Sequence, residues 1–166
     1  MRFAPLFLLA AAGALAQKIT VEFDESVDFT KFHTFAIRDG QLNSKNPSLN
    51  SELVKKRIDA DIIKYLQARR LEWTDGKSDL NVRYRLGSAI KMETEAYPAG
   101  WRGWGTAVIR VPYSEGTLVI DLRDPIPRAL VWRSIARVEK SDPMKLEGKL
   151  EDMVKKSFEK YPPKHK

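Results

Sequence analysis

The chain has 166 residues, contains no cysteine, and carries 29 lysines and arginines against 22 aspartates and glutamates, which gives a formal net charge of +7. Without cysteine it forms no disulfide and no thiolate metal site, and His33 and His165 lie at no metal-ligand spacing, so we expect neither a metal nor another cofactor. Basic and acidic residues are interleaved along the chain, which is typical of a solvated surface and argues against nucleic-acid binding.

The first sixteen residues have the three parts of a secretory signal peptide. Arg2 supplies a positive charge, residues 3–15 form an uncharged apolar stretch, and Ala14-Leu15-Ala16 is a small-x-small cleavage site. The apolar stretch is shorter than the roughly 20 residues that span a bilayer, and Gln17 stands where a lipoprotein would need cysteine. We therefore predict a cleavable signal peptide over 1–16 and an exported protein, periplasmic or extracellular, without a lipid anchor or transmembrane segment.

The remaining residues, 17–166, fit a single domain, since a chain of this length buries enough surface for a core without disulfides. Its first part alternates apolar and polar residues and predicts two strands followed by a polar loop. The strands cover 18–23 and 32–37, Asp39-Gly40 closes the second, and the loop covers 41–48.

A long amphipathic helix is predicted over 49–70. Its apolar residues recur at helical spacing and form one stripe. These residues are Leu49, Leu53, Val54, Ile58, Ile62, Tyr65 and Leu66. Ser48 or Asn50 can cap the start of the helix, and Arg69 and Arg70 lie where the helix dipole favours cations.

Three or four strands follow the helix. Apolar and polar residues alternate again in 80–86, as expected for a strand. The polar members Asn81, Arg83 and Arg85 indicate one solvated face. Residues 116–122 and 128–138 are expected to form an antiparallel hairpin, because the two prolines of Asp124-Pro125-Ile126-Pro127 force a turn. One further strand is expected within 106–113.

A second amphipathic helix is predicted to begin at Ser141-Asp142-Pro143 and to end before Pro162-Pro163. Its apolar stripe consists of Leu146, Leu150, Met153, Val154, Phe158 and Tyr161. The order β-β-α-β-(β)-β-β-α predicts an α+β fold, a mostly antiparallel sheet of five or six strands with two amphipathic helices packed on one face.

Several segments resemble the bacterial envelope family called domain of unknown function 4136. They are Phe29–Ala36, Ser78–Tyr84, Gly116–Leu122, Leu130–Ala136 and Tyr161–Pro163. The match is an ordered series of weak motifs over roughly the whole of 17–166. The resemblance implies an exported, often lipid-anchored domain with no assigned activity, and this sequence departs from it by lacking the lipid-bearing cysteine.

One charged pair stands out in the predicted sheet. Asp121 interrupts an apolar strand, and Arg133 lies on the strand expected beside it. If Leu118, Ile120 and Leu122 face the helices together with Leu130 and Trp132, the two charged residues share the opposite face. Opposite charges placed across two strands contribute roughly 0.2–1 kcal/mol. We favour this structural role over catalysis, because no partner base is identifiable, and we place His33 at the surface or a sheet edge.

The segment 97–106 is the most unusual part of the chain, with three aromatics among three glycines and a proline. No regular element is expected there. One interpretation is a mobile loop with a tryptophan folded back onto the core. The other is a recognition loop in which Tyr97, Trp101 and Trp104, with Arg102, bind a sugar ring, a peptide or a partner protein.

Three classes of function remain open. We favour a non-enzymatic envelope module that binds a protein, peptide or glycan. The alternatives are an envelope hydrolase with a carboxylate-based site, which requires acids converging in one pocket, and a binder of polyanions or anionic lipid surfaces. The last would use the lysines of the C-terminal helix and tail, Lys155, Lys156, Lys160, Lys164 and Lys166.

Overall fold

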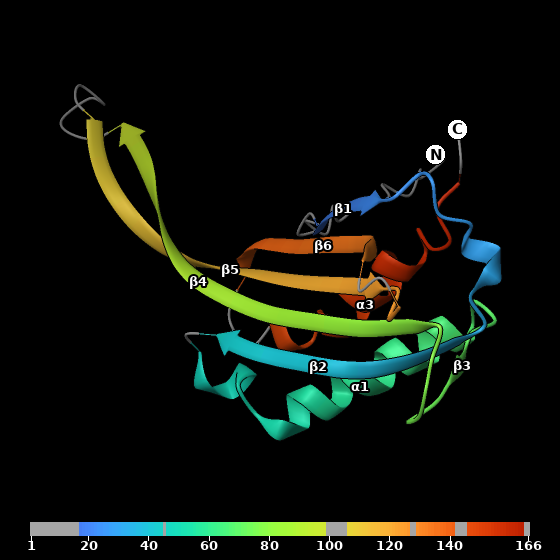
Figure 1. Cartoon of the computed structure of the whole chain (residues 1–166). Helices are drawn as coiled ribbons and strands as arrows, with labels where there is room; N and C mark the ends of the chain where they lie inside the picture. Colours follow the sequence, from blue (N-terminus) through green and yellow to red (C-terminus); the bar gives the residue numbers. More distant parts are fainter. Residues whose placement is uncertain (1–16, 45, 99–105, 127–128, 142–145, 165–166) are drawn as a thin grey trace, which may run out of the picture.

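A computed structural model describes residues 17–44, 46–98, 106–126, 129–141 and 146–164, with the side chains of 88–115 and 139–141 left out. The predicted signal peptide lies outside the described residues. Among the described residues, two α-helices lie against one face of a six-stranded sheet (Figure 1), so the predicted α+β fold is confirmed. The strands are β1 (Gln17–Phe23), β2 (Thr34–Ser44), β3 (Glu72–Trp73), β4 (Leu80–Pro98), β5 (Thr106–Arg123) and β6 (Leu130–Ser141). The helices are α1 (Glu52–Gln67) and α3 (Leu150–Phe158), with short 3-10 turns at η1 (Phe29–Lys31) and η2 (Pro47–Leu49).

The sheet has the strand order β1-β6-β5-β4-β2-β3. The pairs β1–β6, β6–β5 and β5–β4 are antiparallel, as the sequence predicts for most of the sheet, whereas β2 runs parallel to β4 and to β3. Parallel neighbours require a crossover connection, and α1 supplies it between β2 and β4. The parallel edge therefore follows from the position of α1 in the chain.

The second strand is longer than the sequence suggests. β2 continues to Ser44 through a register shift between Ile37 and Asp39, so the predicted end at Asp39-Gly40 and the loop from residue 41 are wrong. Gly40 allows close packing, because a Cβ built there would overlap the ring and hydroxyl of Tyr84 on β4. The glycine accommodates a neighbouring ring and does not end the strand.

The strands expected within 106–113 and over 116–122 are a single strand, β5. It pairs with β4 from Asn81↔Arg123 to Pro98↔Thr106, and in Figure 1 this long hairpin curves away beyond the other strands. Tyr97, Pro98 and Thr106 therefore lie in strands and not in the predicted loop. The two-residue strand β3 has no counterpart in the prediction.

The first helix begins later than predicted. Ser51 caps α1, its hydroxyl accepting a hydrogen bond from the Val54 N–H (3.2 Å). The two residues predicted as caps do not cap α1. The Asn50 side chain forms hydrogen bonds with the backbone of Ser44, and Ser48 lies inside the preceding turn η2. The predicted stripe is buried at Val54, Ile58, Ile62 and Leu66, but Leu53 is exposed.

The whole predicted stripe of the second helical segment is buried, from Leu146 to Tyr161. Trp132 of β6 is the largest fully buried side chain, stacks on Phe158 at 5.6 Å and meets Tyr161 edge to face. The predicted start at Asp142-Pro143 lies outside the described residues. No helix in the part of the chain that the structure describes has the length and apolar character needed to cross a membrane.

Candidate functional site

A pocket of about 620 Å³ lies at the end of the sheet where β2 and β4 begin and β5 ends. We call it the end pocket. It is lined by Lys31, Phe32, Arg38, Lys77, Ser78, Asp79, Asn81, Asp124, Pro125 and Ile126. These residues come from the η1 segment, from β2, from the β3–β4 turn with the start of β4, and from the β5–β6 turn.

The β5–β6 turn holds an apolar side chain out at this pocket. Asp124 Oδ1 accepts a hydrogen bond from the Ile126 N–H (3.0 Å), and the Asp124 N–H donates to the Ala129 carbonyl (2.9 Å). Pro125 lies between Asp124 and Ile126, and the proline ring fixes the backbone φ at this position. Ile126 is 93% exposed, although isoleucine is usually buried. The turn thus presents one large apolar group to solvent at a fixed place.

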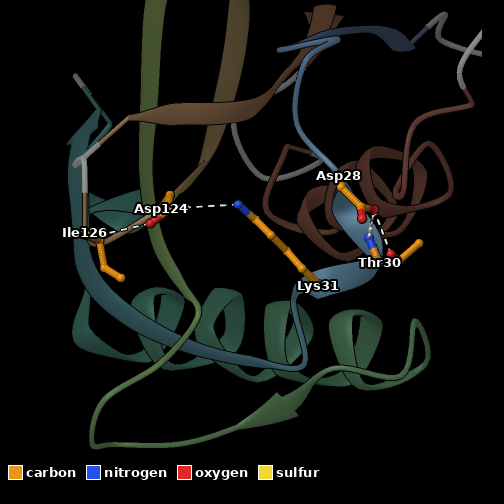
Figure 2. A network of polar contacts seen from close by, with 5 residues as sticks. All are labelled: Asp28, Thr30, Lys31, Asp124 and Ile126. Carbon is orange, nitrogen blue, oxygen red and sulfur yellow. Dashed lines mark hydrogen bonds and ion pairs between the residues drawn. The ribbon is translucent and has the colours of Figure 1, made fainter.

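Lys31 reaches across to this turn from η1 (Figure 2). Its Nζ lies 3.6 Å from Asp124 Oδ2 and 4.9 Å from the centre of the Phe32 ring. Asp28 caps η1, accepting hydrogen bonds from the N–H (2.9 Å) and hydroxyl (2.6 Å) of Thr30. The cap fixes the backbone that carries Lys31, but half of the Lys31 side chain remains exposed.

Arg38 of β2 closes another side of the pocket. Its Nε donates to Asn81 Oδ1 (3.1 Å), its Nη1 to the Asp75 carbonyl (3.1 Å), and its Nη2 to the Gly76 carbonyl. Arg38 therefore holds the turn that carries Lys77. Of the three cations that line the pocket, Lys31 alone forms an ion pair within the described part of the chain.

Asp79 joins the starts of β2 and β4. Its Oδ2 accepts hydrogen bonds from the N–H groups of His33 and Thr34 (both 2.9 Å), and its own N–H donates to Thr34 Oγ1 (2.9 Å). The hydrogen bond from the His33 N–H stabilises the carboxylate and lowers the pKa of Asp79 below its usual value. Asp79 is thus ionised at neutral pH, and its carboxylate is already engaged by the backbone. His33 is exposed, and its backbone takes part in this contact.

The structure brings Asp121 and Arg133 together on the sheet face opposite the helices. The register places them directly across β5 and β6, and Arg133 donates from Nε to Oδ1 (2.7 Å) and from Nη2 to Oδ2 (2.8 Å). These bonds raise the pKa of Arg133. Leu130, expected to face the helices, is only half-buried and pairs with Arg123, because the register of β6 shifts next to Trp132. A smaller hollow of about 190 Å³ is lined by this pair.

The comparisons with known proteins fit this fold. The family model described as a domain of unknown function (DUF4136) matches residues 19–163. The chain belongs to the DUF4136 family. The resemblance noted in the sequence is thereby confirmed. No curated protein matches the sequence of this DUF4136 chain significantly.

Two solved structures resemble the domain. A DUF4136 family protein from Bacteroides thetaiotaomicron aligns with a TM-score of 0.58 and 16% identity, over 88% of this chain and 96% of that chain. A PDZ domain protein from Parabacteroides distasonis aligns with a TM-score of 0.60 and 18% identity, over 90% of this chain and 36% of that chain. The DUF4136 chain thus spans about a third of the latter protein. At these identities the likeness shows the fold alone.

Of the residues proposed as a recognition site, the structure describes only the backbone of Tyr97. Tyr97 lies near the end of β4, where it pairs with Ala107. Trp101, Arg102 and Trp104 lie outside the described residues. Because β4 begins at the end pocket and runs 19 residues, roughly 60 Å separates its two ends along the strand. The end pocket and Tyr97 therefore lie at opposite ends of β4.

The lysines considered for polyanion binding are partly engaged in holding α3 to β1. Lys156 Nζ contacts Asp152 Oδ2 (2.8 Å) and Gln17 Oε1 (3.0 Å), and Lys160 Nζ donates to the Ile19 carbonyl (3.1 Å). Lys155 and Lys164 are exposed, and Lys166 lies outside the described residues. These contacts fasten the helix to the edge strand.

Sequence reasoning did not find the end pocket. Its charged residues come from four separate segments, and no spacing rule joins them. The available signal was an isoleucine between the two prolines of the β5–β6 turn, a place where an apolar side chain has no core to enter. That signal identifies one wall of the pocket but not the cations opposite.

Proposed function

We propose that this DUF4136 domain is an exported protein of the cell envelope that binds a ligand without catalysing a reaction, and that the end pocket is its binding site. The export signal in residues 1–16 supports the location. The observation that carries the binding role is the end pocket itself, where an exposed isoleucine and three cations surround one space of about 620 Å³.

The dimensions and chemistry of the end pocket suit a small ligand or the end of a chain. Ligand sites typically enclose about 300–1,000 Å³ and combine apolar walls with a few placed polar groups. Here Phe32, Pro125 and Ile126 form the apolar part, and hydrogen-bond donors form the rest. Ile126 held in water has no benefit for folding, and burial against a ligand would recover its apolar contact.

The carboxylates of the end pocket favour binding over hydrolysis. A carboxylate-based hydrolase needs one acid that keeps a proton at working pH. Asp79 has a lowered pKa and accepts two backbone N–H groups, and Asp124 accepts the Ile126 N–H while facing Lys31. Both carboxylates therefore serve to shape the pocket.

The export part of the proposal is tested by sequencing the N-terminus of the protein purified from its own cells after fractionation. We expect a chain that starts at Gln17 in the envelope or medium fraction. A chain that starts at Met1 in the cytosol contradicts export.

The binding part is tested by a fragment screen on the ¹⁵N-labelled mature chain by NMR. We expect fragments that shift the amide signals of Asn81 and Ile126, and we expect Ile126→Asp to abolish those shifts. The matched control is Leu53→Asp, which changes another exposed apolar side chain, 72% exposed on α1 and outside the pocket lining. If no fragment of any charge affects the pocket signals, the proposed site is wrong.

A further inference from the structure

We infer that the end pocket selects an organic carboxylate whose charged group lies beside a short apolar group, and that Lys31 exchanges Asp124 for the carboxylate of the ligand. This inference rests on the proposed binding function and names its ligand class. Such chemistry is found in a free acid derived from an apolar amino acid and at the C-terminus of a peptide. The experiment below separates these two sources.

The charge of the end pocket determines the sign of the ligand. Lys31, Arg38 and Lys77 supply three positive charges, against Asp79 and Asp124. Asp79 is already stabilised by two backbone N–H groups, so it competes little for the cations. A guanidinium has five N–H groups, and three of those of Arg38 are engaged with protein acceptors. Its remaining donors and the exposed Lys77 are available to an anion.

The Lys31–Asp124 contact is built to exchange. At 3.6 Å, with 53% of the Lys31 side chain exposed, it is a loose surface pair of the kind that contributes little to stability. When a ligand binds, its carboxylate takes the place of the Asp124 carboxylate beside Lys31. Asp124 meanwhile keeps the hydrogen bond from the Ile126 N–H, so the turn stays folded during the exchange.

The apolar part of the ligand is placed by the same turn. Asp124 and Ile126 are two residues apart and joined by a hydrogen bond (Figure 2). Lys31, which pairs with Asp124, and the exposed Ile126 both line the end pocket. A ligand that satisfies both has its charge next to its apolar group. The apolar residues of the lining, Phe32, Pro125 and Ile126, each lie within two residues of Lys31 or Asp124, which favours a short apolar group beside the charge over a long acyl chain.

The test compares four probes by NMR titration of the ¹⁵N-labelled mature chain. N-acetyl-leucine carries both the carboxylate and the apolar group, N-acetyl-leucinamide lacks the charge, N-acetyl-glycine lacks the side chain, and octanoate has a long chain. We expect N-acetyl-leucine to bind about tenfold more tightly than each of the other three, with shifts at Lys31, Asn81 and Ile126. Equal binding of the acid and its amide, tighter binding of octanoate, or no shift with N-acetyl-leucine overturns the inference.

The source of the carboxylate is decided by N-acetyl-Ala-Ala-Leu as a free acid. Tighter binding than N-acetyl-leucine identifies a peptide end, because the added backbone then finds partners in the pocket. Weaker binding identifies a small free acid. The shared chemistry stands in both cases, provided that the amide of the same tripeptide binds worse than the acid.

Two substitutions are expected to change the affinity for N-acetyl-leucine in opposite directions, which a merely structural role of these residues would not produce. Lys31→Gln should weaken N-acetyl-leucine about tenfold and leave the amide unchanged. Asp124→Asn should tighten N-acetyl-leucine several-fold, because the amide oxygen can still accept from Ile126 while the competing charge is gone. The control Arg85→Gln removes the same charge on the open face of the sheet and should change neither. If Asp124→Asn weakens the acid, the exchange is wrong.

Failure of this inference is distinguishable from failure of the proposed function. If neutral or cationic fragments occupy the end pocket while N-acetyl-leucine does not, the pocket is a binding site for another ligand class. If neither the fragments nor the four probes affect it, both proposals fail.

Discussion

The end pocket and the open face of the sheet each contain an aspartate paired with a cation, and the two pairs differ in every physical respect. Asp121 is 7% exposed and receives two hydrogen bonds from Arg133 at 2.7 and 2.8 Å. Asp124 faces Lys31 at a single contact of 3.6 Å, with the lysine half in water. The first pair is fixed by strand register, and the second joins two turns.

The difference shows that a pair of opposite charges has no fixed meaning for function. A bidentate pair with a buried aspartate is costly to break, because removal of the arginine leaves the buried carboxylate unsatisfied. A loose, solvated pair can open at little cost, and its lysine can bind another anion. The aspartate–arginine pair therefore belongs to the architecture of the sheet, and the lysine–aspartate pair suits a binding site.

The largest effect is expected from Arg133→Met. The substitution leaves the Asp121 carboxylate without its two donors and should lower the free energy of unfolding by about 1–3 kcal/mol, measured by urea denaturation. Arg85→Met on the same face is the control, because Arg85 is exposed and forms no ion pair among the described residues, and should cost less than about 0.5 kcal/mol. Equal losses in the two variants would remove the distinction between the pairs.

A smaller effect is expected from Asp79→Asn, which keeps an acceptor for the His33 and Thr34 N–H groups but removes the charge. The free energy of unfolding at pH 7 should fall by about 1 kcal/mol. Because the pKa of Asp79 is lowered by folding, its ionised form stabilises the native state above the unfolded pKa, about 3.9, and this stabilisation is lost as pH falls through the folded value. Thermal unfolding from pH 5 to pH 2 should therefore be less pH-dependent in the variant. An unchanged slope would show that Asp79 is not the titrating group.

Lys31→Met should cost less than about 1 kcal/mol in the free energy of unfolding, since exposed ion pairs contribute little. Urea denaturation beside Arg133→Met compares the two pairs directly. The same variant should lose binding of N-acetyl-leucine. A loss of stability as large as that of Arg133→Met would make Lys31 structural and would contradict its availability to a ligand.

The smallest effect on stability is expected from Ile126→Ser. A side chain that is 93% exposed gains almost nothing from folding, so the free energy of unfolding should stay within about 0.5 kcal/mol. Binding of N-acetyl-leucine should nevertheless weaken several-fold in NMR titration, whereas binding of N-acetyl-glycine should not change. A marked loss of thermal stability would show that Ile126 packs within the protein.

The sequence by itself determined the features that depend on local periodicity. Helical spacing identified the buried residues Val54, Ile58, Ile62 and Leu66, and alternation identified the strand that begins at Leu80. The position of Asp121 opposite Arg133 could likewise be derived, because two strands joined by a short turn have a narrow choice of register. These features need only neighbours in the chain.

Only the tertiary structure decided where the end pocket lies. Its walls meet because β2 pairs with β4 in parallel across the α1 crossover, which brings Arg38 beside Asn81 and the His33 backbone beside Asp79. It likewise decided that β2 continues through Gly40, since the ring of Tyr84 on the next strand occupies the space above the glycine. Contacts between distant segments depend on which strands become neighbours, and local spacing does not specify that choice.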